Sequence, residues 1–333
     1  MPGGLTEITE IATALGMLAP DLESAITHRP PELSNIPDEV WTRLVAARAT
    51  GAHTASFATA FANGNVFLNA LDGLRGRSPR IIEWKGPHRN PGDDVIPADL
   101  RIDHVYLVSC KYLSSLLLNP GPSRLFDKLL VGEERSRENW FATTAPDEFQ
   151  TLYAATVAEK KLHDFPHGVL ELSTTQRKKL KAELNGKTWP PALKEYWALL
   201  CNRVAIESAI RWRVAMQEQR NQVRLLWRML RISNASYFVL GSDRSSSLRL
   251  RVDSAWDWNQ SFDLRTFEVG AIAGGQPMVA WYGAVHDKQA NADLSIEGHV
   301  EIRWSHGRFR NNPEAKVYLD TPLALIPGYN LLE

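Results

Sequence analysis

Residues 81–112 read IIEWKGPHRNPGDDVIPADLRIDHVYLVSCKY, and this stretch decides the fold that we expect for the chain. Its first part, with Arg80 before it, has the apolar and β-branched composition of a short strand. The segment GPHRNPGDD then has the glycine, proline and asparagine content of a loop. PADLRID and HVYLVSCKY alternate with period two, which predicts two strands joined by a tight turn near Asp103 and His104.

The same alternation places polar side chains of this predicted hairpin on one face. Asp99 and Arg101 share a face of the first strand, Ser109 and Lys111 share a face of the second, and Cys110 points to the opposite side. A carboxylate at the start of one strand and an ammonium at the end of the next can therefore converge. Carboxylates favour Mg²⁺, and a nearby lysine orients the attacking water and stabilises the charge that develops on phosphorus.

Asp99, nine further residues and then Ser109-Cys110-Lys111 form a pattern that resembles the active-site hairpin of the PD-(D/E)xK nuclease superfamily. This is the fold of many type II restriction endonucleases and phage-defence nucleases. The resemblance covers roughly residues 60–130 and includes the order helix, strand, hairpin, helix. It implies that Asp99 is the motif aspartate and Lys111 the motif lysine. Ser109 stands at the (D/E) position, where some members carry a neutral polar residue followed by Cys-Lys.

The resemblance implies a Mg²⁺-dependent endonuclease that hydrolyses DNA phosphodiester bonds in restriction or antiviral defence, with Mn²⁺ able to substitute. Because Ser109 replaces the second acid, we expect another carboxylate to complete the site. Glu83 is the preferred replacement, since a strand positions a ligand more rigidly than a loop, while Asp93 and Asp94 are alternatives. The expected metal ligands are Asp99, Glu83 and Asp94, and the expected catalytic residues are Asp99, Lys111, Ser109 and Glu83. The alternative is that Glu83 is a solvent-facing strand residue.

Charge is distributed unevenly along the 333 residues, although 38 basic and 38 acidic side chains give a net charge of zero. Residues 1–99 hold eight basic and twelve acidic side chains, whereas residues 171–231 hold thirteen basic and five acidic ones. Neutrality excludes a uniformly basic DNA-coating protein. The basic middle segment indicates a polyanion partner, or else the solvated face of a long exposed helix.

Arginines in two segments are the expected nucleic-acid contacts. Residues 191–231 form one long helical pattern with an apolar stripe, and most of its arginines lie away from that stripe. Residues 298–312, GHVEIRWSHGRFRNN, combine arginines with Trp304 in a basic and aromatic edge that can contact phosphates or stack a base. The predicted contacts are Arg213, Arg220, Arg224, Arg303, Arg308 and Arg310.

The expected fold class is α+β, with a restriction-endonuclease-like mixed sheet flanked by helices, a long central helix and a C-terminal β-rich domain. Helices are expected over residues 5–15, 37–74 with a break near Gly64-Asn65, 123–130 and 146–161. Regularly spaced strands after Tyr237 indicate a sandwich or barrel-like domain. We expect a helical N-terminus with the nuclease-like core over 1–165, a basic helical bridge over 166–234 and the β-rich domain over 235–333.

No run approaches the roughly 18 apolar residues that a membrane span needs, and the first residues, MPGGLTEITEIATALG, are acidic. A cytoplasmic protein without a membrane partner is therefore expected, with DNA as partner and a homodimer or a subunit of a defence complex as the assembly. Two alternatives remain open. The first is a catalytically inactive nucleic-acid-binding or assembly subunit with a nuclease-like core, and the second is a scaffold that docks partners along its long helix.

Overall fold

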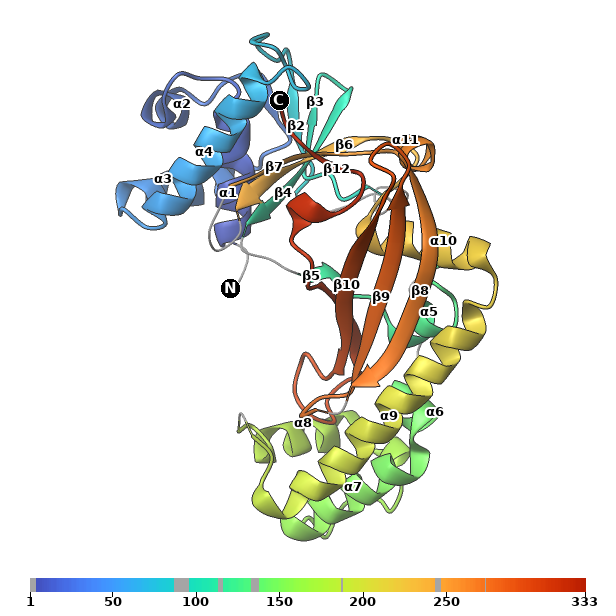
Figure 1. Ribbon diagram of the computed structural model, residues 1–333. Helices are drawn as coiled ribbons and strands as arrows, with labels where there is room; N and C mark the ends of the chain where they lie inside the picture. Colours follow the sequence, from blue (N-terminus) through green and yellow to red (C-terminus); the bar gives the residue numbers. More distant parts are fainter. Residues whose placement is uncertain are drawn as a thin grey trace. The chain divides into compact units, whose positions relative to one another are not determined.

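The computed structural model describes residues 4–86, 96–112, 116–132, 138–186, 188–242, 247–272 and 274–333. Over these residues the chain has the expected α+β character, with a mixed sheet and a second sheet (Figure 1). It divides into two compact units. Unit 1 contains Met1–Ser114, Arg231–Phe262 and Pro322–Glu333, and unit 2 contains Ser115–Leu230 and Asp263–Thr321.

Unit 1 is built on a mixed sheet with the strand order β1-β2-β3-β4-β6-β7-β12. The strands are β1 (Leu33–Ser34), β2 (Ile82–Trp84), β3 (Leu100–Ile102), β4 (Tyr106–Tyr112), β6 (Tyr237–Ser242), β7 (Ser247–Val252) and β12 (Tyr329–Leu331). β1 pairs with β2 and β4 pairs with β6 in parallel, and the other neighbours are antiparallel. The predicted strand, hairpin and mixed sheet are therefore confirmed.

The hairpin between β3 and β4 turns at the two residues that the sequence indicated. Asp103 and His104 both adopt left-handed backbone conformations, with φ of 50° and 61°, and the Val105 amide donates to the Ile102 carbonyl at 3.0 Å. Aspartate tolerates this region because its short side chain bonds nearby backbone. Here Asp103 Oδ1 accepts from the Arg80 amide at 2.7 Å, which ties the turn to the start of β2.

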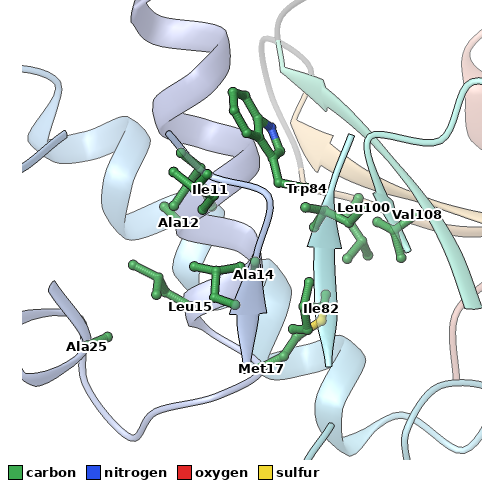
Figure 2. Packing of buried hydrophobic residues seen from close by; sticks show 14 of the residues in the cluster. Ile11, Ala12, Ala14, Leu15, Met17, Ala25, Ile82, Trp84, Leu100 and Val108 are labelled. Carbon is green, nitrogen blue, oxygen red and sulfur yellow. The ribbon is translucent and has the colours of Figure 1, made fainter. Parts of the chain in front are cut away.

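Helices cover one face of this sheet. They are α1 (Gly4–Leu15), α2 (Leu22–His28), α3 (Asp38–Ala49) and α4 (Thr54–Asn69). Figure 2 shows the packing, in which Ile11 and Leu15 of α1 join Ile82 and Leu100 of the sheet in one buried cluster. Leu100 and Ile102 of β3 lie in this core, so the half-buried Arg101 between them belongs to the opposite face of the sheet. The candidate catalytic side chains share that opposite face.

The expected break near Gly64-Asn65 is wrong. The helical stretch is divided instead at Gly51 and His53, whose φ values of 72° and 58° are left-handed, and α4 continues through Gly64. Gly64 lies where α1 crosses α4, and a Cβ added there would overlap the carbonyl oxygen of Thr13. The glycine is used for close helix contact and not to end the helix.

Unit 2 combines helices with the second sheet, whose order is β5-β11-β10-β9-β8. β10 is antiparallel to both β9 and β11, and β11 is antiparallel to β5. The strands are β5 (Leu116–Leu118), β8 (Phe262–Ile272), β9 (Met278–Asp287), β10 (Ala292–Arg303) and β11 (Glu314–Leu319). The helices are α5 (Pro122–Phe126), α6 (Trp140–Thr144), α7 (Pro146–Glu159), α8 (Thr174–Glu183), α9 (Lys194–Ala215) and α10 (Gln219–Leu230), with 3₁₀ turns η1 (Val169–Glu171) and η2 (Pro191–Leu193).

The single long helix predicted over residues 191–231 is wrong in its continuity. α9 ends at Ala215 and α10 begins at Gln219, although neither glycine nor proline stands between them. The Gln222 side chain donates to the Met216 carbonyl at 3.0 Å and so satisfies an acceptor that a continuous helix would have used internally.

The strands after Tyr237 do not form one sheet. β6, β7 and β12 belong to the sheet of unit 1, whereas β9, β10 and β11 belong to the sheet of unit 2. The helix α11 (Ala255–Ser261) and the 3₁₀ turn η3 (Leu323–Leu325) also lie in unit 1. The division therefore differs from the three consecutive segments 1–165, 166–234 and 235–333. Its cause is the parallel pairing of β6 with β4, in which Phe238 lies opposite Val108.

No helix in the described part of the chain is both long and apolar enough to cross a membrane.

Candidate functional site

The register of the β3–β4 hairpin sets Asp99 opposite Ser109. Leu100 pairs with Val108, and the Asp99 amide donates to the Val108 carbonyl at 2.8 Å. The Asp99 carboxylate is buried, and its Oδ2 atom accepts from the Cys110 amide at 2.7 Å and from the Ser109 hydroxyl at 3.4 Å. The sheet therefore brings these two predicted site residues into contact and fixes the orientation of the carboxylate.

Lys111 lies two residues beyond Ser109 on β4, so strand alternation gives both side chains the same face. Its backbone pairs with Gly241 of the neighbouring parallel strand β6. Gly241 has no room for a side chain, because an added Cβ would overlap the Lys111 carbonyl oxygen. The close approach of β6 therefore holds the end of β4 that carries Lys111.

Cys110 points to the helix-covered face, as the alternation predicts, where its thiol lies close to Thr13 of α1. Burial raises the pKa of the Cys110 thiol well above its ordinary value, and the charges of Asp99 and Glu10 raise it further. A neutral thiol is a poor nucleophile. Cys110 is therefore a core residue of the hairpin, and its thiol does not take part in the candidate site.

Glu83, the expected replacement carboxylate, lies opposite Arg101 on the adjacent strand. Arg101 Nε and Nη2 donate to its two oxygens at 2.5 and 2.7 Å, and His104 Nδ1 lies 3.1 Å from Oε2. The hydrogen bond from Arg101 is the main reason that the pKa of Glu83 lies below its ordinary value of 4.5. Glu83 is on the site face, two positions along β2 from the residue opposite Asp99, and is held there as an ion pair.

Substitution Glu83→Gln is expected to lower the free energy of unfolding by about 1 kcal/mol at neutral pH, the usual value for a well-formed surface ion pair. Because the folded state lowers the pKa of Glu83, the pair stabilises the protein above pH 4.5 and this contribution is lost as the pH falls through the lower folded value. Urea unfolding of the parent and the variant at pH 7 and pH 3 measures this, and equal differences at both pH values would contradict the assignment.

The donor chemistry of this face suits Mg²⁺, which takes one or two protein carboxylates together with water and phosphate oxygens. Asp99 and Glu83 are the carboxylates that would hold it. The third predicted ligand, Asp94, and its neighbour Asp93 lie outside the described residues. Within the described ranges, no three His, Cys, Asp or Glu side chains are grouped as a metal cluster.

The predicted nucleic-acid contacts on the helices of unit 2 have different surroundings. Arg220 and Arg224 are exposed and lie one turn apart on α10, so they share one side of that helix. Arg213 Nη2 donates to the Val269 carbonyl at 2.8 Å, which links α9 to β8. Arg220 and Arg224 are therefore suited to phosphate contact, whereas Arg213 has a structural contact.

Two of the three arginines predicted within residues 298–312 line a cavity of about 670 Å³ together with Trp304. These are Arg303 and Arg308, whereas Arg310 is half-buried and faces the charge of Arg177. The other lining cations are Lys181, Lys194 and Lys316. The role of these lysines in the cavity was not predicted from the sequence, because they come from α8, α9 and β11 and have no common spacing.

Comparison of the chain with protein-family models, with curated proteins and with solved structures found no match.

Proposed function

We propose that the chain is a Mg²⁺-dependent endonuclease that hydrolyses DNA phosphodiester bonds at the β3–β4 hairpin. The observation that carries this proposal is the register, which sets Asp99 against Ser109 and places Lys111 on the same face of β4. The elements α4, β2, β3 and β4 also follow each other in the order helix, strand, hairpin that the nuclease resemblance implies. This order supports a restriction-endonuclease-like core, although β5 comes between β4 and the next helix, α5, and both of these belong to unit 2.

The residues have separate roles in the proposed reaction. The Asp99 carboxylate, oriented by the Cys110 amide, would hold the metal, and Glu83, now paired with Arg101, would be the second carboxylate. Bound Mg²⁺ or Mn²⁺ supplies a Lewis acid for the phosphoryl oxygens and lowers the pKa of water. Lys111 orients the attacking water and stabilises charge on phosphorus, while Ser109 keeps a polar contact with Asp99.

The remaining parts of the proposal follow from the same resemblance and from exposed charge. Arg220 and Arg224 on α10 supply sequence-independent phosphate contacts. The resemblance favours a cytoplasmic role in restriction or antiviral defence. A homodimer, or a subunit of a larger defence complex, would place two hairpins on the two strands of a duplex.

One observation favours a second function, a catalytically inactive nucleic-acid-binding subunit with a nuclease-like core. Ser109 occupies the acid position, and Glu83 is already held by Arg101 and His104. While that ion pair persists, Glu83 is not available as the second carboxylate of the candidate metal site. The second function predicts DNA binding with a steep dependence on salt and no cleavage.

Nicking of a supercoiled plasmid distinguishes the two functions. The nuclease proposal expects nicked and linear products with Mg²⁺ or Mn²⁺ and none in excess EDTA. Protein that binds the plasmid in a salt-dependent manner, but leaves it intact with either metal, would instead establish the second function. DNA binding is measured in the same samples by fluorescence anisotropy with a labelled duplex.

Substitution Ser109→Glu tests the metal site directly. A carboxylate opposite Asp99 adds a hard oxygen ligand, so Mg²⁺ affinity, measured by isothermal titration calorimetry, is expected to rise by about tenfold. Ser109→Gln is the matched control, because it introduces the same bulk at a buried position without the charge. Equal Mg²⁺ affinity in the two variants would contradict metal binding at this face.

A further inference from the structure

The cavity of unit 2 has the size and chemistry of a binding site distinct from the hairpin. It has a volume of about 670 Å³, within the range of roughly 300–1,000 Å³ typical of small-molecule sites. Its walls come from α8 and the segment after it, the start of α9, the residues between β8 and β9, the end of β10 with the turn after it, and β11. All of these residues belong to unit 2, so the cavity is formed within one compact part of the chain.

The charge around this cavity is positive. Five of its described lining residues are cations and none is acidic: Lys181, Lys194, Arg303, Arg308 and Lys316. Carboxylates outside the lining pair with two of them, Glu301 with Arg303 at 2.9 Å and Glu314 with Lys316 at 3.4 Å.

Lys181 and Lys194 are exposed and form no ion pair within the described ranges. An anionic ligand would gain most from these two lysines, because their charges are not already compensated.

Lys181 is also positioned by the fold. Gly307 has φ of 103°, and a Cβ added there would lie 2.7 to 2.9 Å from three carbon atoms of the Lys181 side chain. The turn after β10 therefore packs directly on the aliphatic part of this lysine. The Lys181 side chain therefore loses less rotamer freedom when a ligand binds than an unrestricted surface lysine would.

Tryptophans form an aromatic floor beside these cations. The Trp197 ring stacks with the Trp189 ring, with 5.0 Å between the two ring centroids. It also stacks with the Trp304 ring, with 5.8 Å between the centroids. The Arg308 guanidinium lies 4.4 Å from the Trp189 ring centroid and donates to the Leu184 carbonyl at 2.9 Å. Aromatic and guanidinium groups next to lysines are the combination that nucleotide sites use, with bases against flat groups and phosphates against ammonium groups.

We propose that this cavity binds a nucleotide, either free or within a nucleic-acid strand, with its phosphates paired to Lys181 and Lys194 and its base against the aromatic floor. The proposal is independent of the nuclease proposal, because none of the cavity residues belongs to the β3–β4 hairpin. Phosphate and base are both required, which distinguishes this site from a general anion site.

Isothermal titration calorimetry of the full chain tests the proposal with four probes: dATP, deoxyadenosine, inorganic triphosphate and single-stranded oligo-dA of about twelve nucleotides. The assay is run without divalent metal, so that the hairpin site does not contribute. We expect dATP or oligo-dA to bind about tenfold or more tightly than either triphosphate or deoxyadenosine. Binding of dATP identifies a free nucleotide as ligand, whereas binding of oligo-dA alone identifies a strand.

The variant Lys181→Ala/Lys194→Ala is expected to weaken this binding by about tenfold or more. Its matched control is Lys178→Ala/Lys179→Ala, which removes two lysines from α8 outside the cavity lining and should change binding by less than about twofold. Circular dichroism confirms that both variants fold. The proposal is overturned if neither dATP nor oligo-dA binds, if triphosphate binds equally well, or if both double variants weaken binding alike.

Discussion

Replacement of Asp99 by asparagine or of Lys111 by methionine lowers metal-dependent DNA cleavage by about a thousandfold or more if the hairpin is the catalytic site. Asp99 would lose the negative charge that holds the metal, and Lys111 would lose the ammonium that stabilises the transition state. In the proposed reaction both residues would act on the same phosphate. The combined variant is therefore expected to be about as inactive as either single one, since residues that act as a unit are not additive.

Both substitutions are chosen to preserve the fold. In Asp99→Asn the amide side chain keeps an oxygen that can accept from the Cys110 amide, and in Lys111→Met the new side chain keeps most of the original length beside Gly241. The matched control is Lys128→Met, which removes an exposed lysine of unit 2. Cleavage is measured under single-turnover conditions, and DNA binding by anisotropy should stay within about threefold of the parent because the proposed phosphate contacts lie elsewhere.

Two results would contradict the site. Variants at Asp99 and Lys111 that cleave at the parental rate would show that the hairpin is not the catalytic centre. Loss of DNA binding in step with loss of cleavage would show instead that these residues serve in binding, which is the second proposed function.

The hairpin could be predicted from the sequence because its determinants are local. Period-two alternation sets which side chains share a face, and the Asp103-His104 pair supplies the left-handed turn that fixes the register. The shared face of Asp99 and Ser109 follows from these two features. The Arg101 partner of Glu83 was not predicted, because it depends on the register of β2 against β3, which are separated by residues 85–99 of the sequence.

The pairing of β4 with β6 could not be predicted for a related reason. The two strands are separated by all of the helices of unit 2, and nothing in the sequence YFVLGS indicates which sheet it will join. Pairing between two strands this far apart in the sequence leaves no local sequence pattern from which it could be predicted. The cavity lysines could not be predicted for the same reason, because Lys181 and Lys194 lie on different helices and line one cavity only in the folded chain.

Gly64 shows how a local rule can fail when tertiary contact decides the outcome. Glycine next to asparagine is usually a turn signal, yet here the pair lies inside α4. Asn63 beside it is fully buried and donates to the Gly241 carbonyl at 2.8 Å, while its Oδ1 accepts from Arg249 Nε at 2.9 Å. This part of α4 therefore contacts α1 on one side and the sheet on another.

Substitution Gly64→Ala is expected to lower the free energy of unfolding by about 2 kcal/mol, the usual cost of forcing an extra carbon into a packed contact. The direction of this change is informative, because alanine in an exposed helix interior normally raises the free energy of unfolding by about 1 kcal/mol relative to glycine. Here the new Cβ would meet the Thr13 carbonyl, and α1 must move away from α4.

Gly4→Ala on α1 is the matched control, since a Cβ there meets open space and the substitution should be neutral or slightly stabilising. Urea unfolding followed by circular dichroism compares the two variants, and a Gly64→Ala protein as stable as the parent would show that the helices do not cross as closely as the structure places them.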